Sequence, residues 1–168
     1  MNTLQIGGVV RESIVDGPGI RMTVFVQGCS HGCDGCHNQE LQPTAGGKTA
    51  TVADILAQAR SNPLLDGITI TGGEPFQQAE GCAALAAAAR AAGYHVMTYS
   101  GYPFEALYEG IDKVPGWRGL LEASDLLVDG PFLMAQRDLQ LRFRGSRNQR
   151  ILDVPASLRA GHAVEATL

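Results

Sequence analysis

The fold of this chain is constrained most by a regular alternation of short apolar runs with helical segments. The apolar runs are rich in β-branched and aromatic residues, as strands are. We expect strands over residues 20–27, 67–71, 94–99, 125–128 and 148–154. We expect helices over residues 51–60, 77–92 and 104–108. Strands that alternate with helices form βαβ units, so the sequence predicts an α/β fold with a mostly parallel sheet.

The length of the chain limits how many such units it can hold. A complete barrel of eight strand–helix units takes roughly 250 residues, whereas this chain has 168. We therefore expect a single domain over residues 1–168 that forms a partial, open parallel β/α barrel.

Charge and hydropathy exclude several classes of protein. The formal net charge of -4 disfavours a general nucleic-acid binder, because phosphate contacts need clustered basic charge. No apolar run reaches the roughly 20 residues of a membrane span, and the first residues lack the pattern of a secretion signal. We expect a cytoplasmic protein with no membrane or nucleic-acid partner, in a compartment that keeps cysteines reduced.

Special residues follow four of the predicted strands. They are the cysteine-rich loop 28–38, the sequence GGEP at 72–75, Ser100 with Gly101, and Asp129 with Gly130. The carboxyl ends of parallel strands meet at one edge of a sheet, which is where parallel α/β folds bind ligands. The sequence therefore predicts one site built from these four loops.

The cysteine-rich loop holds Cys29, Cys33 and Cys36. Three thiolates can bind a [4Fe–4S] cluster and leave one iron without a cysteine, and an open coordination position is typical of catalytic metals. A zinc site that recruits His31 or His37 is an alternative, although structural zinc sites usually have two separated ligand pairs. The loop alone favours an iron–sulfur cluster over zinc and over inert cysteines.

The sequence CSHGCDGC at 29–36 resembles the CxxxCxxC signature of the radical S-adenosylmethionine (SAM) superfamily, and GGEP resembles its SAM-binding GGE motif. The resemblance implies two cofactors, a [4Fe–4S] cluster and SAM. It implies that Cys29, Cys33 and Cys36 are the metal ligands and catalytic residues. Many members have an aromatic residue before the third cysteine, where this chain has Gly35. Adenine must then be held by backbone or by other side chains.

The same resemblance implies which residues contact SAM. Gly72 and Gly73 would let the backbone approach the methionine part, and Glu74 would accept a hydrogen bond from its ammonium group. The other expected cofactor contacts are Gly35, Cys36, His37, Ser100 and Asp129.

Three further segments indicate which family of the radical SAM superfamily the chain resembles. Residues 13–21 (SIVDGPGIR) resemble the N-terminal segment of glycyl-radical-enzyme activases. The sequences LVDGPF at 127–132 and RGSRNQR at 144–150 resemble segments of the anaerobic (class III) ribonucleoside-triphosphate reductase activating proteins. This resemblance implies a glycyl-radical activase whose partner is the glycyl-radical subunit of that reductase, with a low-potential electron donor such as flavodoxin.

Three other functions stay open on the sequence. They are activation of another glycyl-radical enzyme, radical SAM chemistry on a small molecule as in 7-carboxy-7-deazaguanine synthase, and metal binding without catalysis. A further expectation is that the arginine-rich segment 137–159 helps to dock the partner. Cys82 is expected to be a small buried side chain. His31 could tune the cluster by hydrogen bonding or simply face water, and we expect the second.

Overall fold

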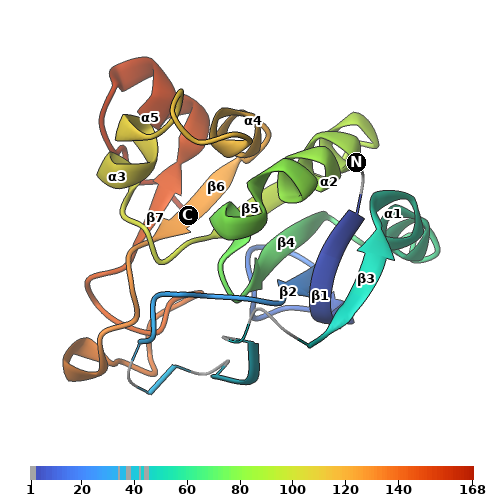
Figure 1. Cartoon of the computed structure of the whole chain (residues 1–168), viewed down its shortest axis with the longest axis horizontal. Helices are drawn as coiled ribbons and strands as arrows, with labels where there is room; N and C mark the ends of the chain where they lie inside the picture. Colours follow the sequence, from blue (N-terminus) through green and yellow to red (C-terminus); the bar gives the residue numbers. More distant parts are fainter. Residues whose placement is uncertain (1–2, 34, 37–38, 42, 44–45) are drawn as a thin grey trace.

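The computed structural model describes residues 3–33, 35–36, 39–41, 43 and 46–168. Its strands form one sheet in the order β3-β1-β2-β4-β5-β6-β7 (Figure 1). The strands are β1 (Thr3–Ser13), β2 (Arg21–Val26), β3 (Lys48–Thr51), β4 (Gly67–Gly72), β5 (His95–Tyr99), β6 (Leu126–Asp129) and β7 (Arg150–Asp153). The α-helices are α1 (Val52–Arg60), α2 (Ala79–Ala91), α3 (Phe104–Glu109), α4 (Trp117–Glu122) and α5 (Val154–Ala160). Short 3₁₀ helices cover Gln39–Leu41, Pro75–Gln78 and Met134–Gln136.

The four central strands, β2, β4, β5 and β6, run parallel and are joined by helical crossovers. The outer strands β1, β3 and β7 are antiparallel to their neighbours. The predicted α/β class is confirmed, as are all the predicted strands and helices. The parallel part is the centre of the sheet, so the sheet is more mixed than the sequence predicts. Within the described ranges, no helix is both long and apolar enough to cross a membrane.

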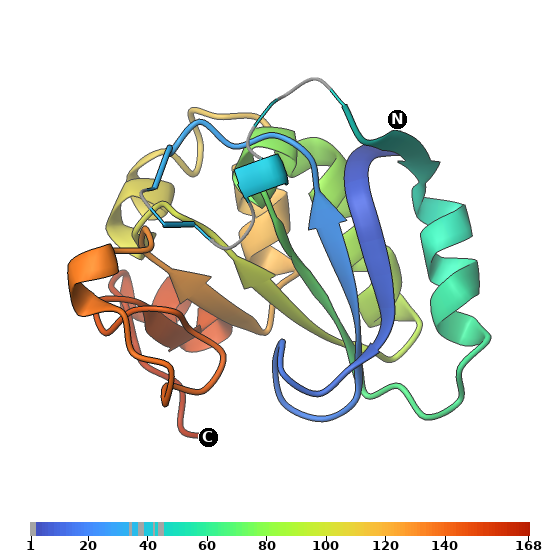
Figure 2. The ribbon, with the colours of Figure 1, turned by 90° about the horizontal axis from the view of Figure 1, so that it is seen from below.

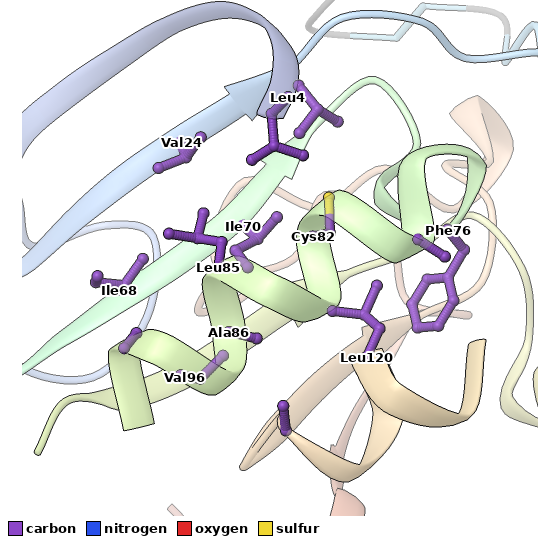
Figure 3. Packing of buried hydrophobic residues seen from close by; sticks show 14 of the residues in the cluster. Leu4, Val24, Ile68, Ile70, Phe76, Cys82, Leu85, Ala86, Val96 and Leu120 are labelled. Atoms are coloured by element: carbon purple, nitrogen blue, oxygen red, sulfur yellow. The ribbon is translucent and has the colours of Figure 1, made fainter. Parts of the chain in front are cut away.

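One face of the sheet packs against the helices and forms the main apolar core. Val24 on β2 and Ile70 on β4 are fully buried there, because alternate side chains of a strand point to the same face. They meet helix α2, whose many alanines let it lie close to the sheet. Figure 3 shows Cys82 of α2 among these apolar side chains, with Leu4 and Leu85 nearby. Cys82 is fully buried, which confirms the prediction for it.

The opposite face of the sheet carries a second, smaller apolar cluster, formed by Met97, Leu126, Val128 and Ile151, together with buried polar side chains. Arg21 is 1% exposed, and its guanidinium donates to Thr69 Oγ1 at 2.7 Å and to the carbonyl oxygens of Pro18 and Ile68 at 2.9 and 3.0 Å. Burial lowers the pKa of Arg21 to about 10. Arg21 therefore stabilises the turn before β2 through hydroxyl and carbonyl acceptors.

Four elements were not predicted from the sequence, and each has a local reason. Strand β1 contains Gly7 and Gly8, which weaken a strand pattern, and its pairing with β2 shifts register there. Strand β3 has only four residues. Helix α4 contains Gly119, which lets it approach Ala83 of α2 closely. Helix α5 follows β7 without a loop, because Asp153 ends the strand and caps the helix.

Candidate active site

The carboxyl ends of β2, β4, β5 and β6 lie along one edge of the sheet and border a cavity of about 580 Å³. Two long connections complete its wall. One is the cysteine-rich loop after β2, and the other is the segment 130–149 between β6 and β7 (Figure 2). The predicted meeting of the four loops at one edge is therefore confirmed.

All three cysteines of the loop line this cavity. The backbone N–H of Cys36 donates to the carbonyl of Cys33 at 3.2 Å, which forms a tight turn between these two cysteines. Burial raises the pKa of the Cys29 thiol, and a hydrogen bond from the backbone N–H of His31 partly opposes this rise. Iron binding would therefore displace protons from the loop.

The three thiols supply the donor chemistry that an iron–sulfur cluster needs, because such clusters bind thiolates. Among the described residues, no three His, Cys, Asp or Glu side chains lie close enough together to hold one metal ion. The three thiols that share one cavity are therefore a donor set that suits such a cluster.

Two glycines allow the cysteine-rich loop to pack closely on its neighbours. A Cβ on Gly73 would lie 2.3 Å from the carbonyl oxygen of Gly28, so the loop rests directly on the end of β4. Gly35 has a φ of 71°, and a Cβ there would lie 1.9 Å from Cε of Met134. Met134 and Phe132 thus fill the space beside the residue before the third cysteine.

The carboxylate of Glu74 is fully buried and accepts hydrogen bonds from four protein groups. The backbone N–H groups of Phe76 and Gly101 donate at 2.9 and 2.7 Å. The Ser100 hydroxyl donates at 3.0 Å to Oε2, and His31 Nε2 lies 2.6 Å from Oε1. Glu74 and Ser100 are thus brought together as predicted candidates for one site. The direct hydrogen bond from SAM to Glu74 stays a prediction, since it requires one of these donors to leave.

His31 does not face water, so the sequence prediction for it was wrong. Its side chain is 17% exposed and lies against Glu74 and the ring of Tyr102. Glu74 is 43 positions further along the chain. No local sequence pattern announces a contact over that separation.

The carboxylate of Asp129, for which a cofactor contact is expected, is bound by groups of the protein itself. Its side chain is 1% exposed, accepts from the backbone N–H of Phe104 at 2.8 Å and forms an ion pair with Arg150. Arg150 also pairs with Glu105 at 2.8 Å. Asp129 therefore caps α3 and anchors β7, and its contact with a cofactor stays a prediction. His37 lies outside the described residues.

The LVDGPF and RGSRNQR segments bind each other. The side-chain amide of Gln149 donates to the carbonyl of Gly130 at 3.0 Å, and its oxygen accepts from the backbone of Gly145 at 2.9 Å. Asn148 donates to the carbonyl of Pro131 at 2.8 Å. These contacts fasten both ends of the segment 130–149, which forms one wall of the cavity.

Arg144 is a cavity residue that the site prediction did not include. It is the only lysine or arginine among the described residues that line the cavity. Its buried Nε atom has no hydrogen-bond partner in the described part of the chain. Its place as the first residue of RGSRNQR is the signal that could have indicated it.

Comparison with known proteins gives the family. Residues 15–152 match the model of a family described as a 4Fe-4S single cluster domain. The anaerobic ribonucleoside-triphosphate reductase-activating protein of Haemophilus influenzae is 32% identical over 148 residues, which cover 82% of this chain and 90% of that protein. The chain belongs to this activating-protein family. The Vibrio cholerae protein of the same name is 34% identical over 146 residues, which cover the same shares.

Two more distant similarities accompany these relatives. The pyruvate formate-lyase-activating enzyme of Clostridium pasteurianum is 41% identical over 81 residues, which cover 45% of this chain and 34% of that enzyme. QueE from Escherichia coli aligns with 59% of this chain and 53% of its own, at a TM-score of 0.48 and 17% identity. Membership of the activating-protein family makes the chain a radical SAM enzyme with a [4Fe–4S] cluster and SAM as cofactors. The expected family and cofactors are thereby confirmed.

Proposed function

We propose that this activase generates a glycyl radical on an anaerobic ribonucleoside-triphosphate reductase. The observation that carries the proposal is one cavity that joins the three cysteines to the glycine end of β4. When bound, the cluster would supply the electron for reductive cleavage of SAM to methionine and a 5′-deoxyadenosyl radical, and that radical would take a hydrogen atom from the partner's glycine. The names of the relatives support the reductase as that partner.

The side chains of the cavity support a division of roles around SAM. Cys29, Cys33 and Cys36 would hold the cluster. Gly73 lets the cysteine-rich loop rest on the end of β4, so that the cysteines and this strand end border the same cavity. Arg144 supplies the positive charge that a carboxylate such as that of the methionine part requires.

The adenine of SAM needs a contact that the loop itself lacks at Gly35. Phe132 and Met134 supply apolar surface beside this glycine, within 3.5 and 1.9 Å of the position of an added Cβ. We assign adenine to this surface, because aromatic rings and thioethers both pack well on a flat heteroaromatic base.

Several finer points belong to the same proposal. Parallel strands with helices on one face and a cavity at their carboxyl ends support a partial, open β/α barrel, and the one sheet supports a single domain over residues 1–168. The need for a low-potential electron supports reduced flavodoxin as the donor, and three reduced thiols support a cytoplasmic location. Arg150 is engaged internally, so partner docking would fall to the exposed Arg142 and Arg147.

The decisive experiment is anaerobic reconstitution with iron and sulfide, followed by reduction and addition of SAM. We expect 5′-deoxyadenosine to form, and a glycyl-radical EPR signal to appear only when the reductase is added. Replacing the chemical reductant by reduced flavodoxin should preserve both. SAM cleavage without any radical on the reductase would contradict the assigned partner, and a reconstituted protein that never cleaves SAM would contradict the function itself.

A further inference from the structure

His31 connects the cysteine-rich loop to the end of β4 through two different groups. Its backbone N–H interacts with the thiol of Cys29, two residues earlier in the loop. Its side-chain Nε2 lies 2.6 Å from Oε1 of Glu74. One residue therefore contacts both an expected cluster ligand and the glutamate of the GGE motif.

The space around the His31 ring is shaped to hold it. The ring of Tyr102 packs edge-on against it, with ring centroids 4.6 Å apart and planes at 75°. A Cβ on Gly101 would lie 2.5 Å from Cδ2 of His31, so the glycine leaves room for the imidazole. Packing and hydrogen bonding thus fix the ring in one orientation.

Apart from His31, the carboxylate of Glu74 is held by groups outside the cysteine-rich loop, while its backbone N–H donates to the carbonyl of Gly28 at the start of that loop at 2.8 Å. The other donors to the carboxylate are the hydroxyl of Ser100 and the backbone N–H groups of Phe76 and Gly101, which belong to the segments after β4 and β5. Among the described residues of the cysteine-rich loop, His31 alone bonds Glu74 through its side chain. The His31–Glu74 contact is therefore a side-chain link between the loop and a rigid part of the fold.

We propose that His31 is a positioning residue that sets the cluster-bearing loop at a fixed place relative to the SAM-binding ends of β4 and β5. The inference rests on the cluster and SAM assignments made under the proposed function. His31 touches neither the reacting atoms nor the metal in this role. It acts by fixing the position of Cys29 relative to Glu74, so that one SAM molecule can contact the cluster and the strand ends at the same time.

The test compares three variants of His31 in the reconstituted enzyme. His31→Ala removes the ring and the hydrogen bond, His31→Phe keeps a ring without a donor, and His31→Gln keeps a donor. We expect the iron content to stay near that of the wild type, since the cysteines are intact. The KM for SAM should rise about tenfold or more in the Ala and Phe variants, and less in the Gln variant. The exposed His162→Ala is the matched control and should leave KM unchanged.

A second readout does not depend on the loaded enzyme. In the cofactor-free protein, hydrogen exchange at the Gly101 amide and alkylation of Cys29 should both become faster in His31→Ala and not in His162→Ala. Unchanged KM, exchange and alkylation would overturn the proposal. A lower KM in His31→Ala would overturn it as well, because it would mean that His31 competes with SAM for Glu74. If all variants cleave SAM but no radical forms on the reductase, the assigned partner fails while the role of His31 stands.

Discussion

The four cysteines of this chain occupy two regions with opposite properties. Cys82 lies on the helix-covered face of the sheet, fully buried among apolar side chains (Figure 3). Cys29, Cys33 and Cys36 lie at the strand ends and line an open cavity. Burial raises the pKa of Cys82 strongly, and the negative charge of Glu74 raises it further. The same side chain therefore packs as a hydrophobe on the helix-covered face, whereas at the strand ends it is open to a cofactor.

The largest expected difference in SAM cleavage is between variants of the three cavity cysteines and a variant of the buried Cys82. Cys29→Ala, Cys33→Ala and Cys36→Ala should each reduce SAM cleavage to background, because the cluster loses a ligand. Iron analysis and 5′-deoxyadenosine formation measure this. Cys82→Ala should keep full iron content and lower the free energy of unfolding by only about 1 kcal/mol. Loss of the cluster in Cys82→Ala would show that the buried cysteine is needed for cluster binding.

Two glycine substitutions separate the strand ends at the cavity from the rest of the sheet. Gly73→Ala places a Cβ 2.3 Å from the carbonyl of Gly28, so the cysteine-rich loop must shift. We expect SAM binding to fall by roughly two orders of magnitude, as misplacement at a site by about 1 Å commonly does. Gly8→Ala in β1 is the control, since a Cβ there meets nothing within 4 Å. Equal SAM affinity in both variants would argue against contact between the loop and β4.

Removing Arg150 tests how much its ion pair with Asp129 stabilises the fold next to the cavity. Arg150→Ala leaves the buried carboxylate of Asp129 without its cation, and the free energy of unfolding should fall by about 2 kcal/mol in urea titrations. Glu105→Ala removes only the exposed partner of Arg150 and should change stability by less than about 1 kcal/mol. Similar losses in the two variants would show that Asp129 does not depend on this pair.

Removing the cation of the cavity should have a moderate effect. Arg144→Ala should raise the KM for SAM about tenfold, because a charge-assisted hydrogen bond to a carboxylate is lost. Arg142→Ala is the matched control, since its guanidinium lies over the ring of Phe143, 4.9 Å from the centroid. An unchanged KM in Arg144→Ala would exclude Arg144 from binding SAM.

The smallest expected effect concerns partner docking. Reversing the exposed Arg142 and Arg147 to Glu should weaken activation of the reductase severalfold, and the weakening should diminish at high salt. SAM cleavage without the reductase should stay as in the wild type. Equal activation rates at low salt would remove these arginines from the interface.

The sequence predicts the centre of the fold well and its margins poorly. The central strands and helix α1 follow from apolar runs and from Thr51, whose hydroxyl caps α1 by accepting from Asp54 at 3.0 Å. Strand β1 could not be predicted because Gly7 and Gly8 interrupt its pattern, although Gly7 leaves room for Leu41. Packing contacts of this kind involve residues that are distant in sequence, and the strand propensity of a single segment does not predict them.

Some residues of the candidate site can also be predicted from the sequence, and others cannot. Cys29 and Gly73 stand out because their spacing and their place after strands are visible in the sequence. The partners of His31 and Asp129 are not visible, because they come from segments brought together by the fold. Sequence reasoning therefore indicates which groups can do chemistry, while the fold decides which of them hold the others in place.

Both ends of the segment 130–149 are fastened, and this has a consequence for variation in length. Its ends are held by Gln149 and Asn148, while Leu139 near its middle is 78% exposed. Residues could be inserted at Leu139 without disturbing β6 or β7, because loops that are exposed at their tips tolerate added length. The length of this part of the cavity wall can thus change independently of the cysteine-rich loop.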